Sequence, residues 1–566
     1  MIYVVAVDRQ QPRASSDEID LYVRTYYSLL RSSGDVRVRA FEEAHLYSRS
    51  SLHLGAEDLD PDLAAFGYSA GRLPDCMPRI RRIVLAQSPR QFRAAGLPIE
   101  QWTIVRTRGR RRPLRWDGGG TLACFIASAS DIDDLIPIVT AYQLEWNKLR
   151  GRLLNARITD VTDDEALAGA LGDAAAVERL RGALGPRSTE ILKDLIEHEC
   201  DLFVRLLDGS FREYQRSAKR WWHAIAPSLP PNRPVYFVSS NSHSLANLLG
   251  GYARHHSDEI VNFLRRHNFE DLAPRYDEAI AAGDHGLATN ILYYSLRAFI
   301  HEPGIQAGAR MRGVQEFDVA SGVHSIPSPG KIDVDAQIIE LSQLQIDRLD
   351  PRVQVRGIER IVESRAVIVN IDYPLGMAAY HHLSAVATGV DELRGIYIMG
   401  KAATLNGRVG DVMISKVIHD EHSSNTYLFR NALVASDVQP FMKHGTVLDN
   451  QKALTVRSAF LQNREYMDVF YREGYTVMEM EGGPYLSAAY EVAEPQRHPQ
   501  NEIVSLVDQN MFELGVIHYA SDTPYSRRQS LLSKSLSYFG IESTYGCASA
   551  IARRIFQSEL VRLSEG

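Results

Sequence analysis

The chain has 566 residues, of which 45% are hydrophobic and 23% are charged, and its formal net charge is −7. This composition is typical of globular domains and excludes a disordered, collagen-like or disulfide-stapled chain. The slight excess of acidic residues also argues against a strongly basic nucleic-acid-binding surface. At roughly 100–200 residues per domain, the length predicts about three or four domains.

Membrane and metal sites find no support in the sequence. No apolar run approaches the ~18–20 residues that a membrane span needs. The apolar stretch 1–7 is short and ends at Asp8-Arg9, which is typical of a first strand rather than of a signal peptide. The four cysteines, Cys76, Cys124, Cys200 and Cys547, are scattered without metal-ligand spacing. We therefore expect buried thiols, no metal and a cytoplasmic location.

Residues 1–150 are predicted to form an α/β region. Strands are expected over 3–7, 36–41 and 122–127, and amphipathic helices over 17–30 and 132–149. Ser128-Ala-Ser-Asp131 suits the N-terminus of the second helix. Six of the ten residues in 106–115 are arginines. The favoured interpretation is an exposed loop, and the alternative is a contact with phosphate or an acidic partner.

Residues 151–230 have a mostly helical pattern, with amphipathic helices expected over 190–206 and 211–225. The second helix carries Trp221-Trp222, a pair more typical of packing than of base stacking. Four prolines between 227 and 234 mark a domain boundary. The remaining residues, 231–566, are predicted to form one domain with a helical insertion around 250–345.

This last domain alternates strand and helix patterns. After an apolar strand at 235–240 comes a polar turn and a short helix at 245–249. Further strands are expected over 366–371, 395–399, 411–418, 446–456, 475–480 and 514–520, and helices over 375–387, 464–473, 481–493 and 525–539. Buried strands that alternate with crossover helices predict a three-layer α/β/α domain with a mostly parallel central sheet. In such sheets, ligands bind at the carboxyl ends of the strands.

Three short motifs follow one another at such strand ends. Gly395–Ile414 contains a strand, the small-residue turn Gly400-Lys401-Ala402-Ala403 and the start of another strand at Gly410-Asp411-Val412. Glu479-Met480-Glu481 lies where a strand meets a helix, and strand alternation would place both carboxylates on one side. Ser521-Asp522 ends the last predicted strand. Alone, each has an ordinary explanation as a turn, a helix N-terminus or an N-cap.

In this order and spacing, the three motifs resemble the purine nucleoside phosphorylase / uridine phosphorylase superfamily, which includes nucleosidases. The resemblance covers about residues 232–566 and is clearest after 365. AMP nucleosidase of this superfamily also carries a separate domain before its catalytic one, as this chain would. The resemblance implies an N-glycosidase or a nucleoside phosphorylase, acting on a purine-type nucleoside or nucleotide. It also implies a homo-oligomer, with no cofactor beyond phosphate as a possible co-substrate.

The resemblance implies roles for matching residues. Glu481 would bind ribose hydroxyls, Met480 would pack on the sugar, and Asp522, with Ser521 beside it, would protonate the leaving purine. Phe460 lies where the superfamily often has a base-contacting aromatic, although a core position is an equal alternative. The remaining candidates for substrate binding are Glu479, Gly400, Lys401, Ser240 and His243.

The expected phosphate-binding arginines are missing. The loop after the first strand is Ser239-Ser-Asn-Ser-His243, and Ile398 and Lys401 stand where phosphorylases tend to have arginine and serine. Lys401 and His243 could still hold an anion as point charges. Hydrolysis is therefore slightly favoured, with Glu479, His243 or Asp372 as candidate bases for water. The alternative is a non-catalytic nucleoside or nucleotide sensor that has kept the pocket.

Overall fold

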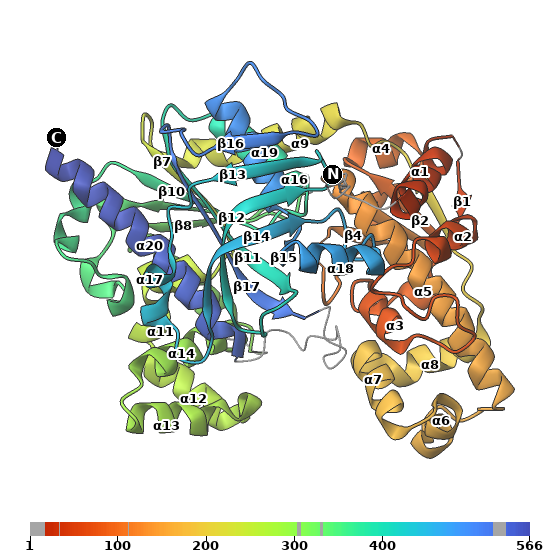
Figure 1. Cartoon of the computed structure of the whole chain (residues 1–566). Coiled ribbons are helices and arrows are strands. Elements are labelled where there is room, and N and C mark those ends of the chain that lie inside the picture. Colours follow the sequence, from red (N-terminus) through yellow and green to blue (C-terminus); the bar gives the residue numbers. More distant parts are fainter. Residues whose placement is uncertain are drawn as a thin grey trace, which may run out of the picture.

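The computed structural model describes residues 17–32, 34–110, 112–302, 307–328, 332–523 and 539–565. Figure 1 shows an N-terminal half, coloured red to yellow, beside a larger C-terminal half built around a twisted sheet. The predicted strand over 3–7 lies outside the described residues. The predicted helix over 525–539 also lies outside them, except for Phe539.

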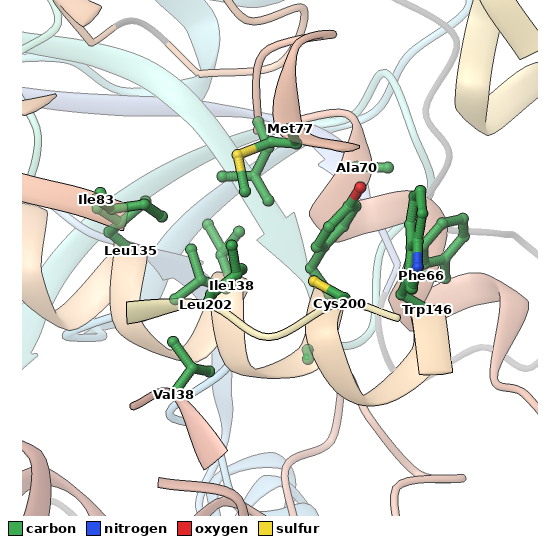
Figure 2. Packing of buried hydrophobic residues seen from close by; sticks show 14 of the residues in the cluster. Val38, Phe66, Ala70, Met77, Ile83, Leu135, Ile138, Trp146, Cys200 and Leu202 are labelled. Atoms are coloured by element: carbon green, nitrogen blue, oxygen red, sulfur yellow. The ribbon is translucent and has the colours of Figure 1, made fainter. Parts of the chain in front are cut away.

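The N-terminal half is a six-stranded sheet with helices. Its strands are β1 (Val36–Arg37), β2 (Arg82–Ala86), β3 (Thr103–Val105), β4 (Leu114–Trp116), β5 (Thr121–Phe125) and β6 (Phe203–Leu206), in the order β1-β6-β2-β5-β4-β3. Its helices are α1 (Asp17–Ser32), α2 (Arg39–Tyr47), α3 (Leu63–Ala70), α4 (Pro89–Ala94), α5 (Ala129–Asn155), α6 (Asp164–Leu171), α7 (Ala174–Leu184) and α8 (Ser188–Glu197). The long helix α5 packs Leu135, Ile138 and Trp146 into the core shown in Figure 2.

Two predicted elements of this half were wrong. The strand expected over 36–41 stops at Arg37, because helix α2 begins at Arg39. Phe41 is buried on that helix and not on a strand. The helix expected over 190–206 ends at Glu197, and its last part is strand β6, which pairs with both β1 and β2. Sheet pairing thus outweighs the helical spacing of the apolar residues near 202–206.

The C-terminal half contains the second sheet. Its strands are β7 (Val235–Ser240), β8 (Val323–Ile326), β9 (Ala336–Glu340), β10 (Val367–Asp372), β11 (Leu393–Thr404), β12 (Val412–Asp420), β13 (Asn425–Phe429), β14 (Val447–Thr455), β15 (Tyr475–Glu479), β16 (Ile503–Leu506) and β17 (Glu513–Asp522). The helices are α9 (Phe211–Ile225), α10 (Ser244–Gly250), α11 (Tyr252–His255), α12 (Ser257–His267), α13 (Leu272–Ala281), α14 (His285–Ile300), α15 (Ala307–Val319), α16 (Ala378–Ala387), α17 (Ala435–Val438), α18 (Arg464–Arg472), α19 (Gly482–Ala493) and α20 (Phe539–Glu565).

Helices cover both faces of this sheet. Along β7, Tyr236 and Val238 pack into a core with helices α10, α14 and α20. The alternate residues Val235 and Phe237 pack into a second core with α9, α16 and α19. Strands buried on both faces read as continuous apolar runs, which is why the sequence pattern located them so well.

The prediction of a mostly parallel sheet was wrong. Of the eleven pairings that the described strands make in this sheet, six are parallel and five antiparallel. Five strands also close on themselves, since β12 pairs with β14, β14 with β15, β15 with β11, β11 with β17, and β17 with β12. The β15–β11 and β17–β12 pairings of this closed set are antiparallel, and β15 and β17 lie on either side of β11.

Several buried residues connect this architecture to the sequence predictions. Trp221 and Trp222 are buried, and the Trp221 indole Nε1 donates to the Val334 carbonyl at 2.9 Å, which confirms their packing role. His381 and His382 are buried on helix α16. All four cysteines are buried free thiols.

Candidate functional site

The carboxyl ends of five C-terminal strands converge. Asp372, the last residue of β10, pairs with Ser240, the last residue of β7, and Ile398 of β11 pairs with Ser239. Further along β11, Ala403 pairs with Met478 of β15 on one side and with Asp522 of β17 on the other. The turn expected at 400–403 is therefore part of strand β11, which continues to Thr404. The structure brings most of the predicted site segments to this edge.

Glu479 stabilises the junction of β15 and α19. Its side chain is fully buried and accepts hydrogen bonds from the Thr455 hydroxyl and from the backbone amides of Glu481 (2.7 Å) and Gly482 (2.6 Å). Burial raises the pKa of this carboxyl group, although these hydrogen bonds oppose the shift. Its contacts thus give Glu479 a capping role at the start of α19.

Glu481 is the more accessible acid of the pair. It is partly exposed, and its Oε1 accepts a hydrogen bond from the Gly376 amide at 3.3 Å. Burial and the neighbouring charge of Glu479 raise the pKa of Glu481 to about 7, and the charge of Arg110 acts in the opposite direction. The arginine-rich segment of the N-terminal half therefore approaches this acid. Such a carboxyl group can bind hydroxyls and can exchange a proton near neutral pH.

A buried histidine, which the sequence did not single out, lies beside this pair. His518 of β17 pairs with Gly400 of β11, and its Nε2 lies 3.9 Å from Glu479 Oε2. A Cβ atom on Gly400 would lie 3.6 Å from the His518 ring and 3.7 Å from the Tyr373 ring. Burial lowers the pKa of His518 to about 4, so the imidazole is neutral at pH 7. A lone histidine in an apolar strand carries no local signal of a site.

The other end of the site is set by β17. The Ser521 hydroxyl donates to the Ala402 carbonyl at 3.4 Å, and Lys401 of β11 is exposed. The backbone of Asp522 lies in β17, opposite Ala403, while its side chain lies outside the described residues. Met480, on the far side of β11, is partly buried beside Leu405 and Met478.

The remaining candidates at the end of β7 are held by neighbours. The Ser240 hydroxyl donates to Asn370 Oδ1 at 2.7 Å, and His243 Nδ1 lies 3.2 Å from the Tyr545 hydroxyl. His243 directly precedes helix α10, and Asp372 is buried at the end of β10. These contacts hold the loop at 240–243 against β10 and α20.

Phe460 lies in a different environment. Its side chain is 1% exposed, and its ring contacts Tyr68, His45 and His53 of the N-terminal half. The neighbouring Gln462 and Asn463 bond to the backbone of the same half, through Ser51 and Ser48. The alternative of a core position therefore describes Phe460, and the structure does not bring its ring together with Glu481.

Two cavities lie away from these strand ends. A cavity of about 590 Å³ is lined by residues of α12, α14 and α15, and another of about 390 Å³ by the amino ends of β7, β10 and β11 with α20. Among the described residues, no group of three or more histidine, cysteine, aspartate or glutamate side chains is placed to hold a metal ion. None of the described helices has the length and apolarity to cross a membrane.

Comparison with solved structures finds nucleosidases and phosphorylases at very low similarity. A 5′-methylthioadenosine/S-adenosylhomocysteine nucleosidase from S. pneumoniae is 11% identical, with a TM-score of 0.29, over 57% of this chain and 98% of that one. A uridine phosphorylase from Schistosoma mansoni, solved with thymine, is 9% identical, with a TM-score of 0.30, over 60% of this chain and 90% of that one. A methylthioadenosine phosphorylase from an antarctic soil metagenomic library is 10% identical, with a TM-score of 0.29, over 45% of this chain and 84% of that one.

At these scores the likeness carries no argument about the activity of this chain. A search of curated proteins finds no match. One family model, described as "Family of unknown function (DUF6909)", matches residues 38–557. That match spans most of both halves, and the chain therefore belongs to this family of unknown function.

Proposed function

We propose that the chain cleaves the N-glycosidic bond of a purine-type nucleoside or nucleotide. Glu481 would bind the pentose hydroxyls, and Asp522 would deliver a proton to the leaving base. The observation that carries the proposal is the pairing of Ala403 with Met478 on one side and Asp522 on the other. With strands about 4.8 Å apart, the two acid-bearing strand ends lie about 10 Å from each other, which is the scale of a nucleoside.

The chemistry supports such a division of roles. Breaking the bond develops positive charge on the pentose and negative charge on the base. A carboxylate beneath the sugar stabilises the first charge, and a proton donor neutralises the second. Glu481, with its pKa of about 7 and its partial exposure, is suited to hydroxyl binding and to charge stabilisation near neutral pH.

Hydrolysis is favoured over phosphorolysis. Ile398 stands where phosphorylases tend to have a phosphate-binding arginine. Its side chain is 3% exposed and belongs to the apolar core. The loop after β7 also lacks arginine. Lys401 and His243 remain as point charges for an anion, and phosphate remains a possible co-substrate. A homo-oligomer in the cytoplasm belongs to the same proposal.

The test is release of free base from purine nucleosides and their monophosphates, followed by chromatography with and without phosphate. We expect phosphate-independent release, which Asp522→Asn lowers about 10²–10⁴-fold. Glu481→Gln should lower it about 10²–10³-fold. Glu465→Gln, an exposed acid on α18, is the matched control. Unchanged release in both site variants would remove these acids from the mechanism.

The second candidate is a nucleoside or nucleotide sensor without turnover. The apolar Ile398 favours it, because the anion site of a phosphorylase is not reproduced. Binding of a nucleoside by calorimetry without any base release would select the sensor. Release that depends on phosphate would instead select a phosphorylase.

A further inference from the structure

A chain of three hydrogen-bonded side chains joins the two halves beside Glu481. Asp420, the last residue of β12, places its Oδ1 2.9 Å from His422 Nδ1. His422 Nε2 lies 3.2 Å from the hydroxyl of Ser130, in the first turn of α5. Ser130 and His422 are separated by 292 residues in the sequence, so this relay forms only where the halves meet.

The relay continues into the loop that precedes α16. The Met377 amide donates to the Ser130 hydroxyl oxygen at 2.9 Å. The adjacent Gly376 amide donates to Glu481 Oε1 at 3.3 Å. Two consecutive backbone amides are thus held from opposite sides, one by the N-terminal half and one by the proposed sugar-binding acid.

Close packing fixes this loop in place. Gly376 has φ of +52°, a conformation that side chains disfavour, and a Cβ there would lie 2.3 Å from the Ser130 hydroxyl oxygen. The same Cβ would lie 3.6 Å from the Met480 carbonyl. The loop therefore lies between α5 and the Glu479–Glu481 junction, and a shift of α5 would displace it.

The order serine, histidine, aspartate also occurs in enzymes with a serine nucleophile. Ser130, however, is fully buried, and its hydroxyl oxygen already accepts the Met377 amide. A nucleophile must reach its substrate, which this serine does not. The contacts of Ser130 instead connect the relay to the Gly376–Met377 loop.

The charges around the relay favour one arrangement of protons. Burial opposes the charge of Asp420, but its hydrogen bonds with His422 and Ser423 outweigh burial and lower the pKa of its carboxyl group. Burial likewise opposes the charge of His422, but Asp420 raises its pKa. Arg457, Asp133 and Glu421 also face this imidazole. The raised pKa of His422 favours the charged imidazole, in which Nδ1–H donates to Asp420 and Nε2–H donates to the Ser130 hydroxyl oxygen. The second lone pair of that oxygen accepts the Met377 amide.

We propose that Ser130, His422 and Asp420 are positioning residues, through which the N-terminal half holds the Gly376–Met377 loop and thereby Glu481 in place. This inference rests on the proposed function only for the role of Glu481. It assigns to residues 1–230 a part in forming the site within a single chain.

The test compares Ser130→Ala and Asp420→Asn with the control Ser458→Ala in the full chain. Ser458 is a buried serine whose hydroxyl has no hydrogen-bond partner among the described residues. By hydrogen exchange, we expect the Gly376 and Met377 amides to exchange about tenfold faster in both relay variants, as for the loss of one net hydrogen bond. Asp420→Asn tests the relay without altering the packing of Ser130 on Gly376.

A second readout separates positioning from general loosening. The Gly376 hydrogen bond lowers the pKa of Glu481, so its loss should move the acid limb of base release to higher pH in the relay variants alone. Exchange no faster than in Ser458→Ala, or an acid limb that does not move, would overturn the inference. If the wild-type protein releases no base, the proposed function is refuted. Faster exchange in the relay variants would then still support the positioning of the Gly376–Met377 loop by Ser130, His422 and Asp420.

Discussion

Two acids on either side of the boundary between the halves, one buried and one partly exposed, behave in opposite ways. Asp134 of α5 accepts from Arg110 at 2.6 and 2.9 Å and from Arg112 at 2.9 Å. Burial opposes its charge, but the two guanidinium groups outweigh burial and lower its pKa. Glu481 has no ion-pair partner among the described residues, and its pKa is raised to about 7. Pairing thus distinguishes an acid that stabilises the fold from one whose proton is available for chemistry.

The largest effect is expected from Asp134→Asn. Removing the carboxylate takes the ion pair from Arg110 and leaves the almost completely buried Arg112 with Asp131 alone, at 3.3 Å. Breaking a buried ion pair from one side typically costs about 3–5 kcal/mol in the free energy of unfolding. Urea denaturation of variant and wild type measures this difference. A loss below about 1 kcal/mol would contradict a stabilising role for the cluster.

Glu481→Gln should have the opposite sign, and its effect should depend on pH. The folded-state pKa of about 7 lies above the ordinary value of 4.5, so the folded state binds the proton more tightly between these values. Wild-type stability therefore falls as pH rises from 4.5 through 7. We expect the glutamine variant to be more stable than wild type by about 1–3 kcal/mol above pH 7 and equal to it below pH 4.5. Thermal unfolding at pH 4 and pH 8 measures both limits, and a gain of equal size at both would contradict the raised pKa.

Local patterns located the strands and helices but not the contacts between distant segments. Helix α9 was predicted with the bounds Phe211–Ile225 that it has, because its apolar residues repeat at helical spacing. The short strands β8, β9, β13 and β16 were missed, because each lacks a long apolar run. The Glu479-Met480-Glu481 motif was found at its strand–helix junction. The relay through Ser130 and His422 was not, since hydrogen bonds across 292 residues leave no periodic signal.

The capping role of Glu479 shows the same limit. From the sequence, both glutamates of the motif were candidates for ligand binding, since strand alternation places them on one side. Glu479 is buried and accepts three hydrogen bonds, including one from Thr455 at the end of β14, whereas Glu481 is partly exposed. The difference arises from the neighbouring strand β14, which local spacing does not reveal.

Gly376→Ala should disturb the boundary itself. The positive φ and the 2.3 Å approach to the Ser130 hydroxyl oxygen oppose any side chain there. Strain of this kind costs about 1–3 kcal/mol. We expect a loss of that size in urea denaturation and faster hydrogen exchange in the first turns of α5 and α16. Gly474→Ala, at a positive-φ glycine with open space around it, is the control for backbone strain alone. Equal losses in the two variants would show that the contact with Ser130 is unimportant.

The smallest effect is expected at an exposed ion pair that also joins the halves. Arg49 and Glu465 lie 3.1 Å apart, but their side chains are 60% and 74% exposed. Water and salt screen such a pair, so Glu465→Gln should change the free energy of unfolding by at most about 0.5 kcal/mol. Urea denaturation at low and high salt, run beside Asp134→Asn, tests whether burial rather than the mere presence of opposite charges sets the strength of these contacts. A loss of unfolding free energy in Glu465→Gln as large as that in Asp134→Asn would contradict this role of burial. It would also contradict the inference that an unpaired, partly exposed acid such as Glu481 is the one available for chemistry.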